Sequence, residues 1–385
     1  MKNNTKDIIE KGGRFYWYFW HLANEGKKRK LDVLLFFVLK CLIPIYYIGF
    51  LFHQFIRKNK IIPKSFPVIS VGNLTLGGTG KSPCVEFILK KLLNKKRKVG
   101  LLTAGYGRKA RDKKETAFSK LKNNLAVEEM GDEPYLFSKH FPQVPVFVSR
   151  NRAKSFLQAT QRGECDIFIM DDGFQYPCID KDLEILLINK RNPFGNGHLF
   201  PGGTLREPVN ALKRADLIIL THTDEYNPFP KLNENGEEIY SILSRNGPGI
   251  PVLESIHHPL YFEDGLSGEK YHPEKLIGKK LLALSSLADP LSFEGTLTKL
   301  GLDVVKKIRF PDHYIYKPDD IEWLFNIAQK EGIDFIVTTE KDWVRVPKEF
   351  KAPVPTLCLV MDFKIIKGGE ILDNLLDRVL EEHKV

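Results

Sequence analysis

The sequence predicts an α/β fold, in which a mostly parallel sheet carries helices on both faces and a second, smaller α/β domain follows. From residue 63 onward, short runs of aliphatic and β-branched residues alternate with helical patterns of apolar residues. The runs are almost continuously apolar, as parallel strands are when helices cover both faces of their sheet. A length of 385 residues fits two or three domains at about 150 residues each.

The composition is that of a globular protein with an excess of positive charge. Hydrophobic residues make up 43% of the chain and charged residues 28%, which excludes a mostly disordered, collagen-like or many-span membrane protein. The net charge of +10 favours an anionic partner: nucleic acid, a phosphorylated small molecule or an acidic lipid surface. Five scattered cysteines without a C-x-x-C pair indicate reduced, mostly buried thiols in the cytosol and no structural zinc.

An apolar segment near the N-terminus, residues 31–52, contains only two charges, Asp32 and Lys40, and has basic residues on both sides. It begins too late for a secretory signal, and no small-residue cleavage site follows it. Because Pro44 would break or kink a helix, we expect a hairpin or broken helix in the interface of an anionic membrane, with its aromatic residues inserted. A buried core helix and a true membrane span are the alternatives.

The expected strands follow one another along the chain. In the first α/β domain they are 67–71, 99–103, 144–148, 167–170, 183–188 and 217–221. In the second they are 281–285, 304–308, 335–338 and 357–361. Apolar residues at helical spacing predict one helix that begins after Lys81 and another that includes Ile321.

A polar stretch rich in glycine and proline, around residues 224–250, indicates a boundary between the two α/β domains. The expected parts are an N-terminal membrane-associating helical segment (1–62), the first α/β domain (63–245), a smaller C-terminal α/β domain with a β linker (246–370) and a C-terminal helix (371–385).

The strongest chemical signal is the run Gly77-Gly78-Thr79-Gly80-Lys81-Ser82, which lies between the expected strand 67–71 and an amphipathic helix. A glycine-rich loop in this place lets backbone N–H groups surround phosphate oxygens, and the N-terminus of the helix adds positive potential. Lys81 would reach the β- and γ-phosphates of a nucleotide, and Ser82 would offer its hydroxyl to Mg²⁺. The usual pattern has glycine six residues before the lysine, where this chain has Thr75. We predict a nucleotide-binding, P-loop NTPase-like domain.

Two acidic residues, Asp171 and Asp172, follow the apolar run 167–170. A P-loop needs a second, metal-holding carboxylate at the end of a neighbouring strand, so one of them would hold Mg²⁺, directly or through water, while the other completes the set. Gln175 follows with a polar side chain that could orient water or phosphate. Two acids at the start of a loop are common, but the upstream P-loop favours the metal site.

Three further polar clusters are weaker signals. The Gly-Asp-Glu-Pro run at 131–134 is typical of a helix start, with Asp132 as the N-cap and proline in the first turn. His313 could serve a nearby acid, although a loop histidine is more often a solvated surface group. The glycine-rich loop 195–208, with its Arg-Glu pair, has the length of loops that are functional or disordered.

Taken together, these residues resemble the tetraacyldisaccharide 4′-kinase family, whose members phosphorylate a lipid A precursor. The motifs stand in the family's order from about residue 65 to 345, and the family's loop places its leading glycine further upstream, as Gly72 does here. They are Val71-Gly72-Asn73-Leu74-Thr75-Leu76-Gly77-Gly78-Thr79-Gly80-Lys81-Ser82-Pro83, Gly105-Tyr106-Gly107-Arg108-Lys109, Gly131-Asp132-Glu133-Pro134, Asp171-Asp172-Gly173-Phe174-Gln175, Phe194-Gly195-Asn196-Gly197, Leu205-Arg206-Glu207-Pro208, Asp312-His313 and Thr339-Glu340-Lys341-Asp342.

The resemblance implies a kinase that uses ATP and Mg²⁺ to phosphorylate the 4′-hydroxyl of a tetraacyldisaccharide 1-phosphate in lipid A biosynthesis. We also expect a monomer without a nucleic-acid partner. Its N-terminal hydrophobic helix would dock on the cytoplasmic face of the inner membrane, monotopic or peripheral. Two α/β/α domains joined by a short β linker would close over the site. The net charge suits a phosphorylated lipid in an anionic leaflet.

Residue roles follow from the motifs by the same resemblance. Asp132 would be the base that takes the proton of the sugar hydroxyl, His313 its partner from the second domain, and Lys81 the cation that stabilises the transferring phosphoryl group. The nucleotide would be held by Asn73, Thr75, Leu76, Gly77, Gly78, Thr79, Gly80, Lys81 and Ser82. Mg²⁺ would be held or oriented by Ser82, Asp171, Asp172 and Gln175. The acceptor would be bound by Tyr106, Gly107, Arg108, Arg206 and Glu207.

Three positions depart from the family's pattern. Ala104 stands where the family usually has arginine, Tyr176 where it commonly has histidine, and Pro201-Gly202-Gly203-Thr204 where it has Pro-x-Gly-Pro. None of these removes a proposed catalytic group, and we expect them to alter lipid specificity.

Two other function classes fit parts of the sequence. A P-loop GTPase or metallochaperone-type switch would use Asp171-Asp172-Gly173 as its switch motif and Thr221-His222-Thr223-Asp224 as a guanine-reading loop, but the lysine that such a loop carries is missing. A nucleotide-gated membrane adaptor would bind ATP without lipid-dependent turnover. We favour the kinase, because it also explains the membrane-seeking N-terminus.

Overall fold

The computed structural model describes residues 8–11, 13, 16–18, 20–21, 30–58, 61–62, 66–105, 117–118, 127–223, 239–347 and 354–383. The chain forms two compact units. The smaller unit consists of Met1–Trp20 and His258–Asp362, and the larger unit consists of His21–His257 and Phe363–Val385. Strands β9 (Val252–Asp264) and β14 (Thr356–Lys367) both run from one unit into the other.

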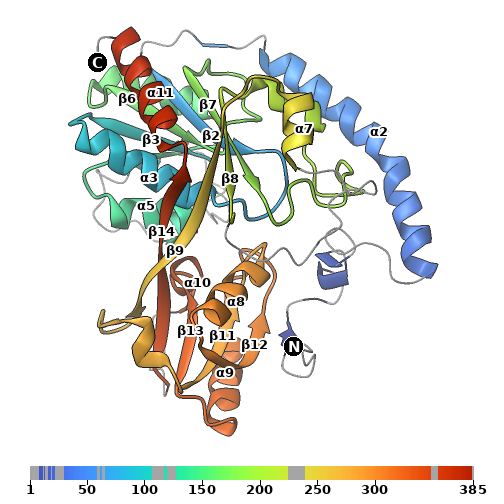
Figure 1. The fold of residues 1–385 in the computed structure, drawn as a ribbon, viewed down its shortest axis with the longest axis vertical. Coiled ribbons are helices and arrows are strands. Elements are labelled where there is room, and N and C mark those ends of the chain that lie inside the picture. The colour runs from blue at the N-terminus through green and yellow to red at the C-terminus, as the bar shows by residue number, and fades with distance from the viewer. Residues whose placement is uncertain are drawn as a thin grey trace. The chain divides into compact units, whose positions relative to one another are not determined.

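A mostly parallel sheet forms the centre of the larger unit (Figure 1), as the sequence predicted. Its strand order is β9-β8-β7-β2-β6-β3-β5-β4, in which only β4 is antiparallel to its neighbour. The bounds are β2 (Val68–Asn73), β3 (Val99–Thr103), β4 (Ala117–Phe118), β5 (Val146–Val148), β6 (Ile167–Asp171), β7 (Leu183–Asn189) and β8 (Leu217–Thr221). Strand β2 pairs with β6 on one side and β7 on the other, so the chain that leaves β2 emerges between two strand ends.

Helices cover both faces of this sheet, because alternate residues of its strands are apolar on both sides. In β6, Ile167 and Ile169 face one core, while Phe168 and Met170 face another. The first core is closed by α3 (Lys81–Asn94), α5 (Asp132–His140) and α11 (Gly369–Glu382). The opposite face is closed by α6 (Arg152–Arg162), η3 (Val209–Arg214) and α7 (Ile239–Asn246), and the short α4 (Val127–Met130) precedes α5.

The smaller unit is a second α/β structure, which confirms the predicted strands there. Its strands are ordered β1-β12-β11-β13-β14, and each is parallel to its neighbour in this order. Helix α9 packs on Leu282 and Leu284 of β11, while α8 packs near Leu281 and Ala283 on the other face. The bounds are β1 (Ile8–Glu10), β10 (Lys270–Tyr271), η4 (Pro273–Leu276), β11 (Lys280–Ser285), α8 (Pro290–Lys299), β12 (Asp303–Arg309), α9 (Pro318–Lys330), β13 (Phe335–Thr339) and α10 (Glu340–Trp343).

The N-terminal apolar segment is one helix, α2 (Lys30–Lys58), with Pro44 inside it, so the predicted hairpin or broken helix is wrong. A proline removes one hydrogen bond from a helix, but the turns on either side of it keep theirs, and a long helix tolerates the defect. Its exposed apolar side chains are Phe37, Val38, Leu42, Ile45, Ile48, Leu51, Phe52, Phe55 and Ile56. The span Leu35–Lys58 is long and apolar enough to cross a membrane and is only 6% buried, which argues against a core helix.

Candidate active site

The glycine-rich loop lies where the sequence predicted it, between the end of β2 at Asn73 and the start of α3 at Lys81. Gly80 precedes α3 with a positive φ of 79°, a conformation that favours glycine. Residues at the ends of β7 and β8 donate hydrogen bonds to the loop. Asn189 Nδ2 donates to the Gly78 carbonyl at 3.3 Å, and Thr221 Oγ1 donates to the Thr79 carbonyl at 3.1 Å.

Gly72 lies within β2, and its lack of a side chain has a packing cause. A Cβ atom there would lie 2.5 Å from Cβ of Phe174, so only glycine lets the segment after β6 come this close. Thr75 forms a bridge with Leu205, and the amide of Arg206 donates to the Leu74 carbonyl at 2.8 Å. The P-loop is therefore bonded to the glycine-rich loop that carries Arg206.

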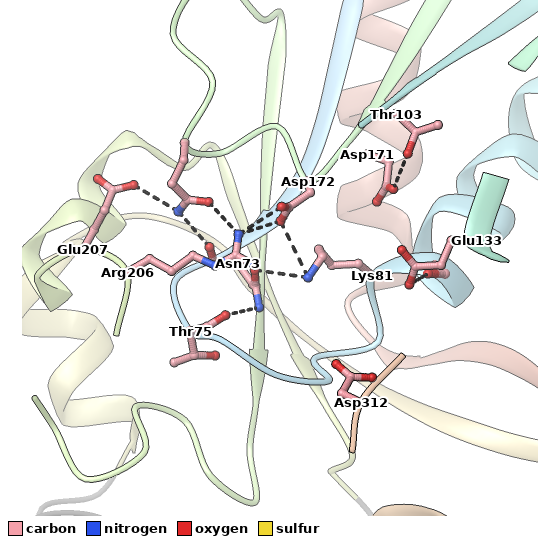
Figure 2. Close-up of polar contacts among 12 residues, drawn as sticks. Asn73, Thr75, Lys81, Thr103, Glu133, Asp171, Asp172, Arg206, Glu207 and Asp312 are labelled. Atoms are coloured by element: carbon pink, nitrogen blue, oxygen red, sulfur yellow. Dashed lines mark hydrogen bonds and ion pairs between the residues drawn. The ribbon is translucent and has the colours of Figure 1, made fainter. Parts of the chain in front are cut away.

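One carboxylate, Asp172, is surrounded by cations (Figure 2). Arg206 Nη1 lies 3.0 Å from both carboxylate oxygens of Asp172, and Lys81 Nζ lies 3.6 Å from Oδ1. Lys81 also donates to Asn73 Oδ1 at 3.3 Å. Burial alone would raise the pKa of Asp172, but Lys81, Arg206 and Arg152 hold it well below its ordinary value. The carboxylate is therefore ionised at neutral pH without any ligand.

Gln175 and Glu207 complete this group, which we call the Asp172 cluster: Asn73, Lys81, Asp172, Gln175, Arg206, Glu207 and Arg214. Gln175 accepts from Arg206 at 3.2 Å and donates to Glu207 Oε1 at 3.0 Å. Glu207 is buried and pairs with Arg214 at 2.6 Å. The structure thus brings together candidate residues that lie more than a hundred positions apart in the chain.

The preceding carboxylate, Asp171, has different neighbours, which we call the Asp171 cluster: Ser82, Thr103, Glu133 and Asp171. Thr103 Oγ1 donates to Asp171 Oδ2 at 3.1 Å, and Ser82 Oγ donates to Glu133 Oε1 at 2.9 Å (Figure 2). The other oxygen, Asp171 Oδ1, is buried and has no hydrogen-bond partner among the described residues. Burial, with the charges of Glu133 and Asp172, raises the pKa of Asp171 to about 7.

The Asp171 cluster fits a divalent cation. Its donors are carboxylate and hydroxyl oxygens, which Mg²⁺ prefers, and a cation would satisfy the buried Oδ1 atom. Within the described residues, no three His, Cys, Asp or Glu side chains gather closely enough to hold a metal ion alone. A magnesium ion here would take its remaining ligands from a hydroxyl, water and nucleotide phosphates, as it usually does.

Asp132 is the first residue of α5, and Gly131 occupies the N-cap position with φ 93°. The predicted helix start is confirmed, but Asp132 is not the N-cap, because Gly131 alone adopts the extended, positive-φ conformation before the helix. Asp132 is 4% exposed, and its Oδ1 accepts from the Glu133 amide at 2.9 Å. Acidic side chains are favourable at a helix N-terminus, and Asp132 and Glu133 both lie in the first turn of α5. Asp132 is therefore next in the chain to Glu133, a member of the Asp171 cluster.

His313 belongs to the smaller unit, in the loop after β12, with φ 57°. Its Nε2 lies 3.3 Å from Lys341 Nζ and 3.8 Å from Asp312 Oδ2. The neighbouring Asp342 is fully buried and accepts from the Ser286 amide at 3.0 Å and from Arg345 Nη2 at 2.8 Å. In the Thr-Glu-Lys-Asp motif at 339–342, the aspartate is therefore structural, and the lysine is presented to His313.

Three candidates, Tyr106, Gly107 and Arg108, lie outside the described residues. Sequence reasoning missed Arg152, whose Nη1 donates to the carbonyls of Asp171 and Asp172 at 2.8 and 2.7 Å. No local signal marks this arginine.

Two further residues beside the P-loop were missed. Asn189 ends β7 and could have been found by the same rule as Asp171, a polar residue at a strand end. His257 packs so closely on the P-loop that a Cβ on Gly80 would lie 2.6 Å from its imidazole. Its Nδ1 lies 3.3 Å from Nδ1 of His222, and only the fold brings these residues to the loop.

Comparison with known families matches most of the chain. The family model described as tetraacyldisaccharide-1-P 4′-kinase matches residues 45–381. Tetraacyldisaccharide 4′-kinase of Anaeromyxobacter sp. (strain K) is 36% identical over 316 residues, covering 82% of this chain and 82% of that protein. The protein of the same name from Halothermothrix orenii is 32% identical over 345 residues, covering 86% and 88%.

A solved structure has the same fold. The crystal structure of the "apo" form of LpxK from Aquifex aeolicus in complex with ATP matches with a TM-score of 0.65 and 29% sequence identity. The match covers 88% of this chain and 98% of that one.

Proposed function

The chain belongs to the tetraacyldisaccharide 4′-kinase family, and on that premise we propose that it transfers the γ-phosphoryl group of ATP to the 4′-hydroxyl of a tetraacyldisaccharide 1-phosphate in lipid A biosynthesis. The observation that carries the proposal is the P-loop flanked by two carboxylate clusters, Asp172 with its cations and Asp171 with its open oxygen. The Aquifex aeolicus structure contains ATP, which supports ATP as the phosphoryl donor.

The P-loop residues would bind the triphosphate. Backbone N–H groups of residues 75–80 and the N-terminus of α3 provide positive potential for phosphate oxygens. Lys81 is held at the start of α3 between Asn73 and Asp172, so it is pre-positioned to neutralise charge on the transferring group. Phosphoryl transfer depends mainly on such positioning and charge neutralisation.

Magnesium would be held by Asp171 and Ser82, with Asp172 and Gln175 orienting its water shell. The open Asp171 Oδ1 and the raised pKa of this carboxyl support the assignment, because a cation relieves both. When bound, Mg²⁺ neutralises phosphate charge and fixes the orientation of the triphosphate. Arg206 keeps Asp172 in place by two 3.0 Å contacts, so the chain itself orders this side of the site.

Asp132 would take the proton of the 4′-hydroxyl, and His313 would support it when the two units close around the substrates. A buried carboxylate beside the nucleophile is the usual additional part of a kinase site, and Asp132 is 4% exposed. Delivery of His313 by the other unit would couple closure to transfer and limit hydrolysis of ATP before lipid arrives.

The acceptor would be bound by Tyr106, Gly107, Arg108, Arg206 and Glu207, and the exposed apolar face of α2 would lie on the cytoplasmic face of the inner membrane. The exposure of that face supports an interfacial, monotopic or peripheral placement. We propose that the protein acts there as a monomer. Bringing the acceptor's acyl chains to the membrane surface would leave the sugar hydroxyl accessible to a soluble site.

The test is transfer of label from γ-labelled ATP to a tetraacyldisaccharide 1-phosphate in detergent micelles with Mg²⁺. We expect lipid-dependent transfer that disappears in Lys81→Ala. Hydrolysis of ATP or GTP that is independent of lipid would instead support a nucleotide switch. Binding of ATP without any turnover would support a nucleotide-gated adaptor.

A further inference from the structure

Helix α2 has a second face that is partly buried and carries polar side chains. Tyr46, Gln54 and Arg57 are spaced eight and three residues apart, which brings them to one side of a helix. This side, which we call the inner face, contacts the rest of the larger unit. The exposed apolar side chains, such as Phe52 and Phe55, lie elsewhere on the helix.

Two hydrogen bonds connect the inner face to the Asp172 cluster. The hydroxyl of Tyr46 donates to the Arg206 carbonyl at 3.0 Å, and Gln54 Nε2 donates to the Gln175 carbonyl at 3.0 Å. The side chains of Arg206 and Gln175 are themselves bonded at 3.2 Å, and Arg206 holds both oxygens of Asp172. Two turns of α2 thus bind the backbones of the two residues whose side chains order Asp172.

A third contact of α2 leads to the backbone of Asp171 and Asp172 through Tyr176 and Arg152. The guanidinium of Arg57 lies 5.1 Å from the ring centre of Tyr176, and that of Arg152 lies 4.4 Å from the same ring. Arg152 donates to the backbone carbonyls of Asp171 and Asp172. The segment 171–176 is therefore in contact with α2 at both Gln175 and Tyr176.

Helix α2 packs closely on the loop that contains Phe200 and Gly202. A side chain on Gly202 would lie 2.8 Å from Ile43 Cδ1, and the rings of Tyr46 and Phe200 are 5.4 Å apart. Gly202 and Phe200 belong to the loop whose backbone bonds to the P-loop. Because packed interfaces of this kind do not deform continuously, α2 and this loop would move together.

We propose that Tyr46, Gln54 and Arg57 are positioning residues, through which α2 sets the geometry of Asp172, Arg206 and Gln175. The helix that meets the lipid surface then also orders the phosphoryl-transfer site, rather than serving as an anchor alone. This inference rests on the proposed function for its kinetic consequence, but its structural consequence, ordering of residues 171–176, does not depend on it.

The test compares a double variant of the inner face with a control variant of a neighbouring tyrosine, and all of the substitutions are nearly isosteric. Tyr46→Phe combined with Gln54→Leu removes both hydrogen bonds and adds apolar surface, so it does not weaken a membrane contact. Tyr47→Phe is the matched control, because its hydroxyl has no hydrogen bond among the described residues. Each protein is measured for lipid-kinase kcat and KM, for partition onto vesicles containing anionic phospholipid, and for amide hydrogen exchange in residues 171–176.

In the double variant we expect kcat to fall about tenfold, which corresponds to the loss of two ordinary hydrogen bonds. Exchange in residues 171–176 should become several-fold faster, while vesicle partition stays at the value of the Tyr47→Phe control. A kcat and an exchange rate equal to the control would overturn the proposal, and so would a loss of rate that follows a loss of partition. If the wild-type protein shows no lipid-dependent transfer, the proposed function fails, and hydrogen exchange alone decides this inference.

Discussion

The two carboxylates at the end of β6, Asp171 and Asp172, are neighbours in the chain and have opposite surroundings. Asp172 meets Lys81 and Arg206, and the pKa of its carboxyl is held low. Asp171 meets a hydroxyl and the like charge of Glu133, and the pKa of its carboxyl is raised to about 7. The Asp172 cluster is electrostatically complete without ligands, whereas Asp171 Oδ1 has no hydrogen-bond partner among the described residues, and we propose that a cation completes this cluster.

The difference arises from one backbone step. Asp171 is the last residue of β6, while Asp172 has φ 52°, a left-handed conformation that Asp tolerates better than most residues. Successive side chains therefore reach different surroundings. Adjacent residues can therefore form a pre-organised half, the Asp172 cluster, and a proposed metal-binding half, the Asp171 cluster.

The largest effect is expected when the Asp172 cluster loses the pre-positioned charge of Lys81. Lys81→Ala should lower phosphoryl transfer by about 10³-fold, because removing one pre-positioned donor to developing charge costs roughly this much. Single-turnover transfer to the lipid measures it. The matched control is Lys90→Ala, an exposed lysine of the same helix, and the assignment fails if both variants keep the wild-type rate.

A somewhat smaller loss is expected at Asp132, which is next in the chain to Glu133 of the Asp171 cluster. Asp132→Ala should reduce kcat by about 10²- to 10³-fold, the contribution of a general base, and should leave ATP affinity within about twofold. His313→Ala should be less damaging, because a partner of the base can be replaced in part by water. Nucleotide binding and turnover are measured together; reduced ATP affinity with normal turnover of bound substrate would contradict both roles.

The pKa of Asp171 leads to a prediction about stability in the absence of metal. The folded protein retains a proton that the unfolded chain releases between pH 3.8 and about 7. This group therefore stabilises the folded state fully below the unfolded pKa, and its contribution declines as pH rises through that window, by at most roughly 1.4 kcal/mol per pH unit. Asp171→Asn should flatten the decline.

Thermal melting in EDTA from pH 5 to 8 measures this difference between the wild-type protein and Asp171→Asn. At pH 8, Mg²⁺ should raise the Tm of the wild-type protein and have little effect on the variant, since the cation would act mainly through this carboxylate. Parallel pH profiles for the two proteins would mean that Asp171 is already compensated, which would remove the contrast between the two clusters.

The parts of the site that could be predicted from the sequence are those with local signals. A glycine-rich run between a strand and a helix identified Lys81, and acids after an apolar run identified Asp171 and Asp172. Arg152 and His257 have no such signal, because their contacts with the site join residues from separate elements. The pKa contrast between the two carboxylates could not be predicted either, since it depends on Glu133 and Arg206 from distant elements.

The fold shows the same division. The continuously apolar strands of both units were predicted because burial on both faces leaves a strong pattern. Strand β9 was missed because it includes Glu254, two histidines and Pro259 and is buried only in part. Helix α2 was mispredicted because Pro44 removes only one hydrogen bond of the helix, while the turns on both sides of it keep theirs.

The smallest expected effect comes from removing Arg214, a cation of the Asp172 cluster that pairs with Glu207. Arg214→Met keeps an unbranched side chain over the Phe174 ring, 4.3 Å from the guanidinium in the wild type, but removes the charge that pairs with buried Glu207 at 2.6 Å. Because the Arg214 side chain is 43% exposed, we expect a loss of about 1 kcal/mol in the free energy of unfolding and a three- to fivefold fall in kcat. Adding Glu207→Gln should restore stability, since no unpaired charge is then buried, but should not restore kcat if Glu207 contacts the acceptor. Urea denaturation and lipid-kinase assays on the two single variants and the double variant measure this coupling, and strictly additive losses of stability would contradict it.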